Sequence, residues 1–175
     1  MSPVDLISPA RWFRIAVMLS LGMIAIFAEA APMGIGPTAR PSPDLLLCVV
    51  AYWAIRRPGS TPLIAVAALG LMRDLLTDVP PGAGMLTLVL AAEVLKAWRR
   101  TLARSSFIFE WIAVAGAAFA ILAVQWVLVV ILLAQPPYIV DLGYQGLYTA
   151  AIYPPIVLVF RWLFRISWRK PEPVI

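Results

Sequence analysis

LGLMRDLLTDVPPGAG, residues 69–84, is the stretch that decides how this chain is built. It begins as the end of an apolar helix and finishes as a Pro/Gly turn. Arg73, Asp74 and Asp78 lie between the two. Charged side chains are costly at membrane depth, so they normally face a bundle interior, a wet cavity or one another. We therefore expect any functional site to be built around this turn.

The composition of the remaining chain indicates a membrane protein. Of the 175 residues, 62% are hydrophobic and 13% are charged, and the mean hydropathy is +0.90. A soluble domain of this length carries more charge, and no polar stretch is long enough for a second domain. We predict a single integral membrane domain over residues 1–175.

The absence of several residue types and motifs limits which catalytic and metal-binding functions are possible. The chain has no histidine, which excludes histidine-based acid–base catalysis and the usual zinc and haem ligand sets. Its single cysteine, Cys48, lies inside an apolar run and is interpreted as a small buried hydrophobe. No phosphate-binding loop, metal cluster or nucleophile motif is present. The sequence favours a non-enzymatic protein without a cofactor.

Six apolar segments predict an all-α polytopic fold, a bundle of six transmembrane helices. The approximate spans are 13–31, 43–56, 61–78, 83–98, 107–134 and 144–163. A spanning helix needs about 20 apolar residues, and the second, third and fourth runs are shorter, so re-entrant segments are the alternative there. The first run resembles a secretory signal, with Ala28-Glu29-Ala30 as a weak cleavage site. Because five more apolar runs follow, we interpret it as a retained span.

Two of these segments carry helix-start signals. In Ser42-Pro43-Asp44 we predict Ser42 as the N-cap, Pro43 as the first helical residue and Asp44 as an acid in the first turn. Thr61-Pro62 repeats the combination of cap and proline.

The basic residues predict the orientation of the bundle. With the N-terminus in the cytoplasm, every Lys and Arg of the 14 except Arg40 and Arg73 falls at the cytoplasmic end of a span. The positive-inside rule therefore predicts that both termini are cytoplasmic and that the number of spans is even. The pI of about 9.9 then reflects topology, and no nucleic-acid partner is expected.

The acidic residues allow two readings. Asp74 and Asp78 are four residues apart and share a helix face, while Arg73 points about 100° away from Asp74. With Asp44, these residues form either a polar pocket or partner contact that opens outward, or a structural charge cluster. In the structural case neighbours such as Glu29, Arg40 or Asp141 would neutralise the charges of the cluster. Glu93 and Glu110 lie near Lys96 and Arg104 and are interpreted as interfacial charges.

The last two runs contain packing signals. Small residues recur at helical spacing along the fifth run, which favours close helix contact with either an internal or an external partner; they are Ala113, Gly116, Ala117, Ala120 and Ala123. In the sixth run, Pro154 and Pro155 remove two backbone donors, free carbonyls near Ala150 and Ala151, and predict a kink. Trp111 is among the aromatic residues expected to anchor the chain at a membrane interface.

The order of several short motifs resembles the bacterial rod shape-determining protein MreD family. They cover nearly the whole chain: PDLLL at 43–47, AYWA at 51–54, RRPG at 56–59, GL at 70–71, DLL at 74–76, PG at 81–82, LYTA at 147–150 and PP at 154–155. Arg73 and the doubled prolines look like local variations, so the resemblance carries a family role to Asp74 more directly than to Arg73.

This resemblance implies a fold, a function and a set of partners. The fold is similar to the six-helix substrate-capture subunits of energy-coupling-factor transporters. The function is that of an inner-membrane scaffold of the machinery that keeps bacteria rod-shaped. The expected direct partner is MreC, which has one membrane helix and a periplasmic coiled coil. With it, the family is expected to help regulate the RodA glycosyltransferase and its class B penicillin-binding transpeptidase, linked to MreB filaments.

Two functional hypotheses follow from different classes. The first is a membrane scaffold that binds MreC near residues 77–84 and 31–43. The second is a small-solute transport subunit in which Arg73, Asp74 and Asp78 line a ligand pocket. An intramembrane enzyme would need a nucleophile or metal site that the sequence does not supply.

Overall fold

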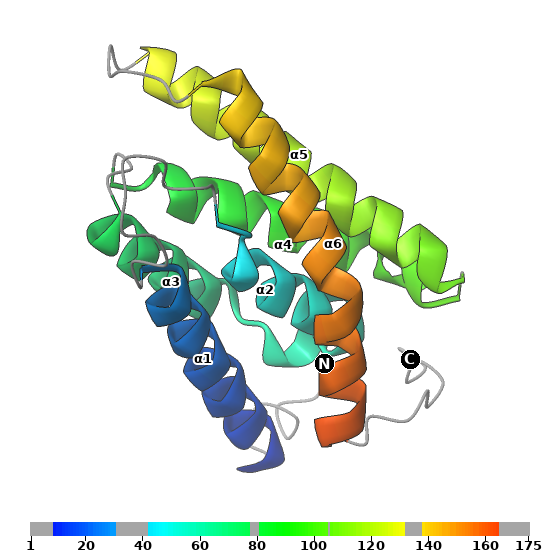
Figure 1. Cartoon of the computed structure of the whole chain (residues 1–175). Helices are drawn as coiled ribbons and strands as arrows, with labels where there is room; N and C mark the ends of the chain where they lie inside the picture. Colours follow the sequence, from blue (N-terminus) through cyan, green and yellow to red (C-terminus); the bar gives the residue numbers. More distant parts are fainter. Residues whose placement is uncertain (1–8, 31–41, 78–80, 105, 132–137, 165–175) are drawn as a thin grey trace.

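The computed structural model describes residues 9–30, 42–77, 81–104, 106–131 and 138–164. Within them the chain is all-helical: α1 (Pro9–Ala30), α2 (Leu45–Arg56), α3 (Leu63–Leu76), α4 (Ala83–Arg104), α5 (Phe107–Ile131) and α6 (Ile139–Phe164), with a short 3-10 turn η2 (Pro58–Ser60) between α2 and α3. Six helices match the six predicted segments (Figure 1).

Helix α2 is the centre of the bundle. It is in contact with α1, α4, α5 and α6, and it lies between them in Figure 1. Every residue from Leu46 to Ile55 is buried. A helix that is apolar all round is normally buried on all sides, and this 12-residue helix follows that rule. Its shortness, which made its membrane crossing uncertain from sequence, fits a central position covered by longer helices.

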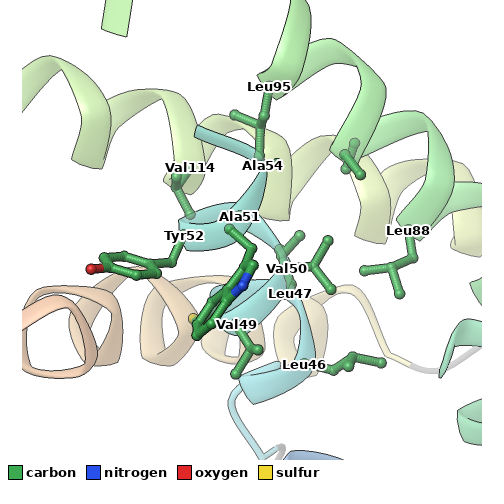
Figure 2. Packing of buried hydrophobic residues seen from close by; sticks show 14 of the residues in the cluster. Leu46, Leu47, Val49, Val50, Ala51, Tyr52, Ala54, Leu88, Leu95 and Val114 are labelled. Carbon is green, nitrogen blue, oxygen red and sulfur yellow. The ribbon is translucent and has the colours of Figure 1, made fainter. Parts of the chain in front are cut away.

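The side chains of α2 fill the core in all directions. In Figure 2, Leu47 and Val50 point toward Leu88 of α4, while Tyr52 points to the other side. There the Tyr52 ring lies 5.1 Å from the Phe160 ring of α6, centroid to centroid. Cys48 is completely buried, as its apolar surroundings predict.

The helix boundaries differ from the predicted spans mainly at three places. Helix α1 begins at Pro9 instead of residue 13. Helix α4 continues to Arg104 instead of ending near residue 98, so the basic residues after Leu95 extend the helix. Helix α6 begins at Ile139, five residues before the predicted start, with Asp141 in its first turn. An acid there is stabilised by the positive end of the helix dipole.

The two predicted helix starts were wrong in detail. The N-cap of α2 is Asp44, not Ser42, because the Asp44 side chain accepts a hydrogen bond of 2.7 Å from the Leu47 N–H. At α3 the residue before the helix is Pro62, with no side-chain cap. The Thr61 hydroxyl instead donates to the carbonyl of Arg57, 3.1 Å away. In both cases the prediction placed the cap too early.

Two of the described helices, Arg11–Ala30 and Phe107–Ile131, are long and apolar enough to cross a membrane by length and composition. Leu45–Arg56 is apolar but shorter. These findings agree with a membrane protein.

Helix α6 continues through Pro154 and Pro155, and the kink predicted there stays a prediction. One consequence of the prolines is visible. Pro154 cannot donate to the carbonyl of Ala150, and the Trp111 indole N–H of α5 donates to that carbonyl at 2.7 Å. Trp111 therefore has a structural role, because its indole N–H replaces the missing bond of α6 and joins α6 to α5; its role as an interfacial anchor stays a prediction.

Replacing Trp111 with phenylalanine should lower the free energy of unfolding by about 1 kcal/mol, since one buried carbonyl loses its donor. In a Pro154→Ala background the same change should cost less, because the introduced alanine supplies a backbone N–H. Thermal unfolding of the four variants in detergent checks this. Equal losses in both backgrounds would show that the indole bond does not compensate for the proline.

Candidate functional site

The buried face of α3 leads directly to the charged residues of the 69–84 stretch. Ala65, Val66, Leu69 and Gly70 are buried at helical spacing, and Arg73 and Asp74 continue the same stripe. Side chains three and four residues apart share a helix face. The charges are buried for this reason: the apolar stripe that packs α3 onto the bundle runs on into them.

Arg73 pairs with the N-cap of α2. Its Nη1 lies 2.8 Å from Oδ2 of Asp44, and both side chains are about nine-tenths buried. The other oxygen of Asp44 accepts from the Leu47 N–H. The Asp44 backbone N–H in turn donates to the Thr149 hydroxyl of α6 at 2.9 Å. The ion pair thus joins α3 to the start of α2, and the bond from the Asp44 backbone to Thr149 adds α6.

Glu29 and Asp74 hold the N-termini of helices other than their own. Glu29, near the end of α1, accepts from the Leu46 N–H in the first turn of α2 at 2.8 Å. Asp74 accepts through Oδ2 from the N–H groups of Gly82 and Met85, 2.9 and 3.0 Å away, where α4 begins. The first turn of a helix has N–H groups without intrahelical partners, and it favours negative charge.

We call Glu29, Asp44, Arg73, Asp74 and Thr149 the Asp44–Arg73 cluster. It contains three acids and one base, and Arg73 lies within electrostatic reach of Glu29 and Asp74 as well as Asp44. The positive ends of α2 and α4 compensate the excess of carboxylates. Its members come from α1, α2, α3 and α6, and its bonds reach α4, so the cluster fixes the relative positions of five helices.

Space in the α3–α4 contact is minimal at Gly84. A Cβ atom at this position would collide with Asp74 Oδ1 and would lie 2.9 Å from Arg73 Nη2. The Asp74 carboxylate cannot move aside without losing its bonds to Gly82 and Met85. Only glycine fits here without displacing the cluster.

Gly84→Ala should therefore lower the free energy of unfolding by about 1–3 kcal/mol, as overpacking of a filled core does. The matched control is Gly116→Ala in α5, where a Cβ meets nothing within 4 Å. Alanine is about 1 kcal/mol more favourable than glycine inside a helix, so the control should be stabilised. Thermal unfolding of both variants measures the difference, and shifts in the same direction would contradict the close approach.

The predicted site residues are only partly brought together. Asp44, Arg73 and Asp74 meet in one cluster, whereas Asp78 lies outside the described residues. Helix α3 ends at Leu76, and the face that Asp74 and Asp78 were expected to share stays a prediction. Of the neighbours expected to neutralise the cluster, Glu29 lies near Arg73, Arg40 lies outside the described residues and Asp141 is exposed. The residue in direct contact with Arg73 is Asp44.

A second buried ionic group was not anticipated. Glu110 is 1% exposed, pairs with Arg56 at the end of α2, and accepts from the Tyr153 hydroxyl of α6 at 2.9 Å. We call these three residues the Glu110 cluster. The interpretation of Glu110 as an interfacial charge was wrong. Glu93 does lie beside Lys96, 2.7 Å away, with a side chain that is 47% exposed.

The structure also shows the contacts of Gln125 and the exposure of the small residues of α5. Gln125 donates to the Thr87 hydroxyl of α4 at 3.2 Å. Helix α5 packs inward through Val114, Ala118, Ile121 and Leu122. In the predicted small-residue stripe, Gly116, Ala120 and Ala123 are exposed, and Ala113 and Ala117 are half-buried. Ala113 packs against the described core, whereas Gly116, Ala120 and Ala123 face away from it.

Both clusters use their charged groups to join helices. Arg73 and Arg56 are each bound to a carboxylate on another helix, and Asp74 accepts from two backbone N–H groups. Among the described residues, no group of three or more Cys, Asp or Glu side chains is arranged to hold a metal ion.

Comparison with known proteins gives one match. The family model of the rod shape-determining protein MreD matches residues 10–166, which includes all members of both clusters. No curated protein and no solved structure matches the chain significantly. Because the match covers nearly the whole chain, this helical membrane protein belongs to the MreD family of rod shape-determining proteins.

Proposed function

We propose that the chain is a non-enzymatic, multi-pass scaffold of the rod-shape machinery in the bacterial inner membrane, with six spans and both termini in the cytoplasm. The family match over residues 10–166 carries this proposal. The even number of helices and the distribution of basic residues support the orientation. In this orientation the Asp44–Arg73 cluster and the α3–α4 turn lie at the periplasmic end. The likeness to substrate-capture subunits of transporters stays a prediction.

The direct partner in this proposal is MreC, and the contact lies at the α3–α4 turn and the 31–43 segment. The cluster supports the proposal by fixing how α3 and α4 meet, so that exposed residues beside the turn have a defined position. Leu75 is 65% exposed, Leu76 44% and Leu86 47%. Through MreC, the scaffold helps to regulate RodA and its class B penicillin-binding transpeptidase, with MreB linked to the same complex.

The geometry decides which substitution can test the proposed MreC interface. Asp74 holds the start of α4, so Asp74→Ala removes a structural bond together with any contact. Leu75→Gln alters an exposed side chain one residue further on, and Ile139→Gln in α6, where the side chain is 71% exposed, is the matched control. MreC co-purified from detergent extracts should be reduced several-fold by the first change and be unaffected by the second. If wild type fails to retain MreC, the scaffold proposal is wrong.

The transport hypothesis has one observation in its favour, because Oδ1 of Asp74 is buried without a hydrogen-bond partner. Arg73 and Asp44 bind each other, and one oxygen of Asp74 is used by two backbone N–H groups. These side chains are engaged in joining helices, which is the structural reading of the cluster.

A further inference from the structure

Two arginines at the start of α1 lie on the face of the helix that packs against the bundle. Arg11 and Arg14 are half-buried, and Ile15 and Met18, which continue the same helix face, are buried. Helix α1 contacts η2 in addition to α2 and α3. Because the end of α1 reaches the first turn of α2 through Glu29, its start lies toward the other end of α2, where η2 follows. The two arginines therefore face the junction of α1 and η2.

Neither guanidinium is neutralised within the described part of the chain. The ion pairs that the described residues form all involve other bases, and the first turn of α1 contains no acid. Arg57, directly before η2, adds a third positive charge near this junction. The Nε of Arg11 and that of Arg14 are buried without a hydrogen-bond partner, whereas their Nη nitrogens are not buried. The pair is therefore an uncompensated positive site with free donors that a ligand can reach.

The site lies at the level of the lipid headgroups. The apolar part of α1, Arg11–Ala30, has 20 residues, and such a helix spans about 30 Å, the thickness of the hydrocarbon layer. Both arginines are therefore at one boundary of that layer. Trp12 and Phe13 in the same turn are 63% and 70% exposed, as is typical of aromatic residues at a membrane interface. The end of α6 lies at the same end of the bundle (Figure 1), and Trp162 there is 84% exposed. A ligand at this site can thus contact the guanidinium groups and the edge of the hydrocarbon layer at once.

We propose that Arg11 and Arg14 form a binding site for the headgroup of an anionic phospholipid. The Nη groups of the two guanidinium planes donate to the phosphate oxygens, an arrangement for which arginine is well suited. The packing of both side chains against the bundle holds these donors in place before the lipid binds, which lowers the cost of binding. The acyl chains lie along the outer side of α1, below Trp12 and Phe13. A zwitterionic lipid offers the same chains without net negative charge, so it should bind more weakly.

The test uses the purified full-length chain in detergent and native mass spectrometry, with phosphatidylglycerol and phosphatidylcholine of identical acyl chains. Phosphatidylglycerol should bind about thirtyfold more tightly, the gain expected for two basic side chains at a membrane surface. The double variant Arg11→Gln/Arg14→Gln should remove most of this preference. The matched control Arg99→Gln/Arg100→Gln, which removes the same number of charges from the last turns of α4, should retain it. Because the lipids are added in detergent, the outcome does not depend on the proposed orientation of the chain in the membrane.

Two further measurements keep the outcome decisive. Each single variant, Arg11→Gln and Arg14→Gln, should weaken the binding of phosphatidylglycerol about fivefold and leave that of phosphatidylcholine unchanged; the single variants also serve if the double variant does not fold. Glycerol phosphate, a headgroup without acyl chains, should not compete at equal concentration. Equal binding of the two lipids, equal losses in the two double variants, unchanged binding in both single variants, or full competition by glycerol phosphate would each overturn the proposal.

Discussion

Arg73→Met is expected to lower the free energy of unfolding by about 3–5 kcal/mol, the loss typical of removing one partner from a buried ion pair. Asp44 would lose its ion-pair partner in a nearly closed site, with Glu29 and Asp74 near by. Methionine fills much of the volume of the arginine stem, so most of the loss is electrostatic. Thermal unfolding in detergent, followed by size-exclusion chromatography, measures it.

Two controls separate this effect from a general cost of losing a cation. Lys96→Met removes the base of the Glu93–Lys96 pair, whose acid is 47% exposed, and should cost less than about 1 kcal/mol. Adding Asp44→Asn to Arg73→Met should recover part of the loss, because the amide oxygen can still cap α2 while the charge is gone. If Lys96→Met costs as much as Arg73→Met, the buried pair has no special role.

Glu110→Leu is expected to cost a similar amount, about 3–5 kcal/mol. The substitution removes the carboxylate partner of Arg56 and the acceptor of the Tyr153 hydroxyl at once. Since Glu110 is 1% exposed, water cannot easily replace either interaction. The same unfolding measurement applies.

Tyr153→Phe is the matched variant for this cluster. It removes only the hydroxyl that donates to Glu110, and a hydrogen bond to a charged group contributes about 1.5–3 kcal/mol. Glu110→Leu should therefore be clearly more destabilising than Tyr153→Phe. The opposite order would mean that the tyrosine, and not the ion pair, holds α2, α5 and α6 together.

Helix content and helix number could be predicted because they depend on local patterns. Long apolar runs, separated by Pro/Gly turns, define the six segments without any knowledge of their partners. The prediction that Asp44 belongs to a helix start was correct for the same local reason, although the cap itself is Asp44 rather than Ser42. Boundaries shifted where charged residues continue a helix, as Lys96 and Arg99 do in α4.

The partners of the charged residues could not be predicted, because they depend on which helices are neighbours. Arg73 and Asp44 are 29 residues apart in sequence, and Arg56 and Glu110 are 54 apart. The residue spacing within a single helix does not indicate that α2 lies at the centre of the bundle. It also does not indicate that side chains of other helices bind α2 at both of its ends. One signal was available: α2 has no charged residue between Leu45 and Ile55, which is typical of a helix that is buried on every side.

Glu29 and Thr149 illustrate a second kind of contact that could not be predicted from the sequence. Their side chains bind backbone N–H groups at the start of α2. Such contacts cannot be predicted from the amino-acid sequence, because the backbone groups are the same at nearly every residue. Gly84 is similar, because the need for a residue without a Cβ arises from Asp74 and Arg73 on another helix. Such positions become visible only when the helices are placed against one another.

The proposed contact between MreC and the exposed end of the α3–α4 pair can be tested by site-specific photo-crosslinking in growing rod-shaped cells. A photoreactive amino acid at Leu75 should give a covalent adduct with MreC. The same amino acid at Ile139, which is 71% exposed at the start of α6, should give little or none. An adduct at Ile139 without one at Leu75, in cells that remain rod-shaped with both variants, would show that MreC does not bind at the α3–α4 turn.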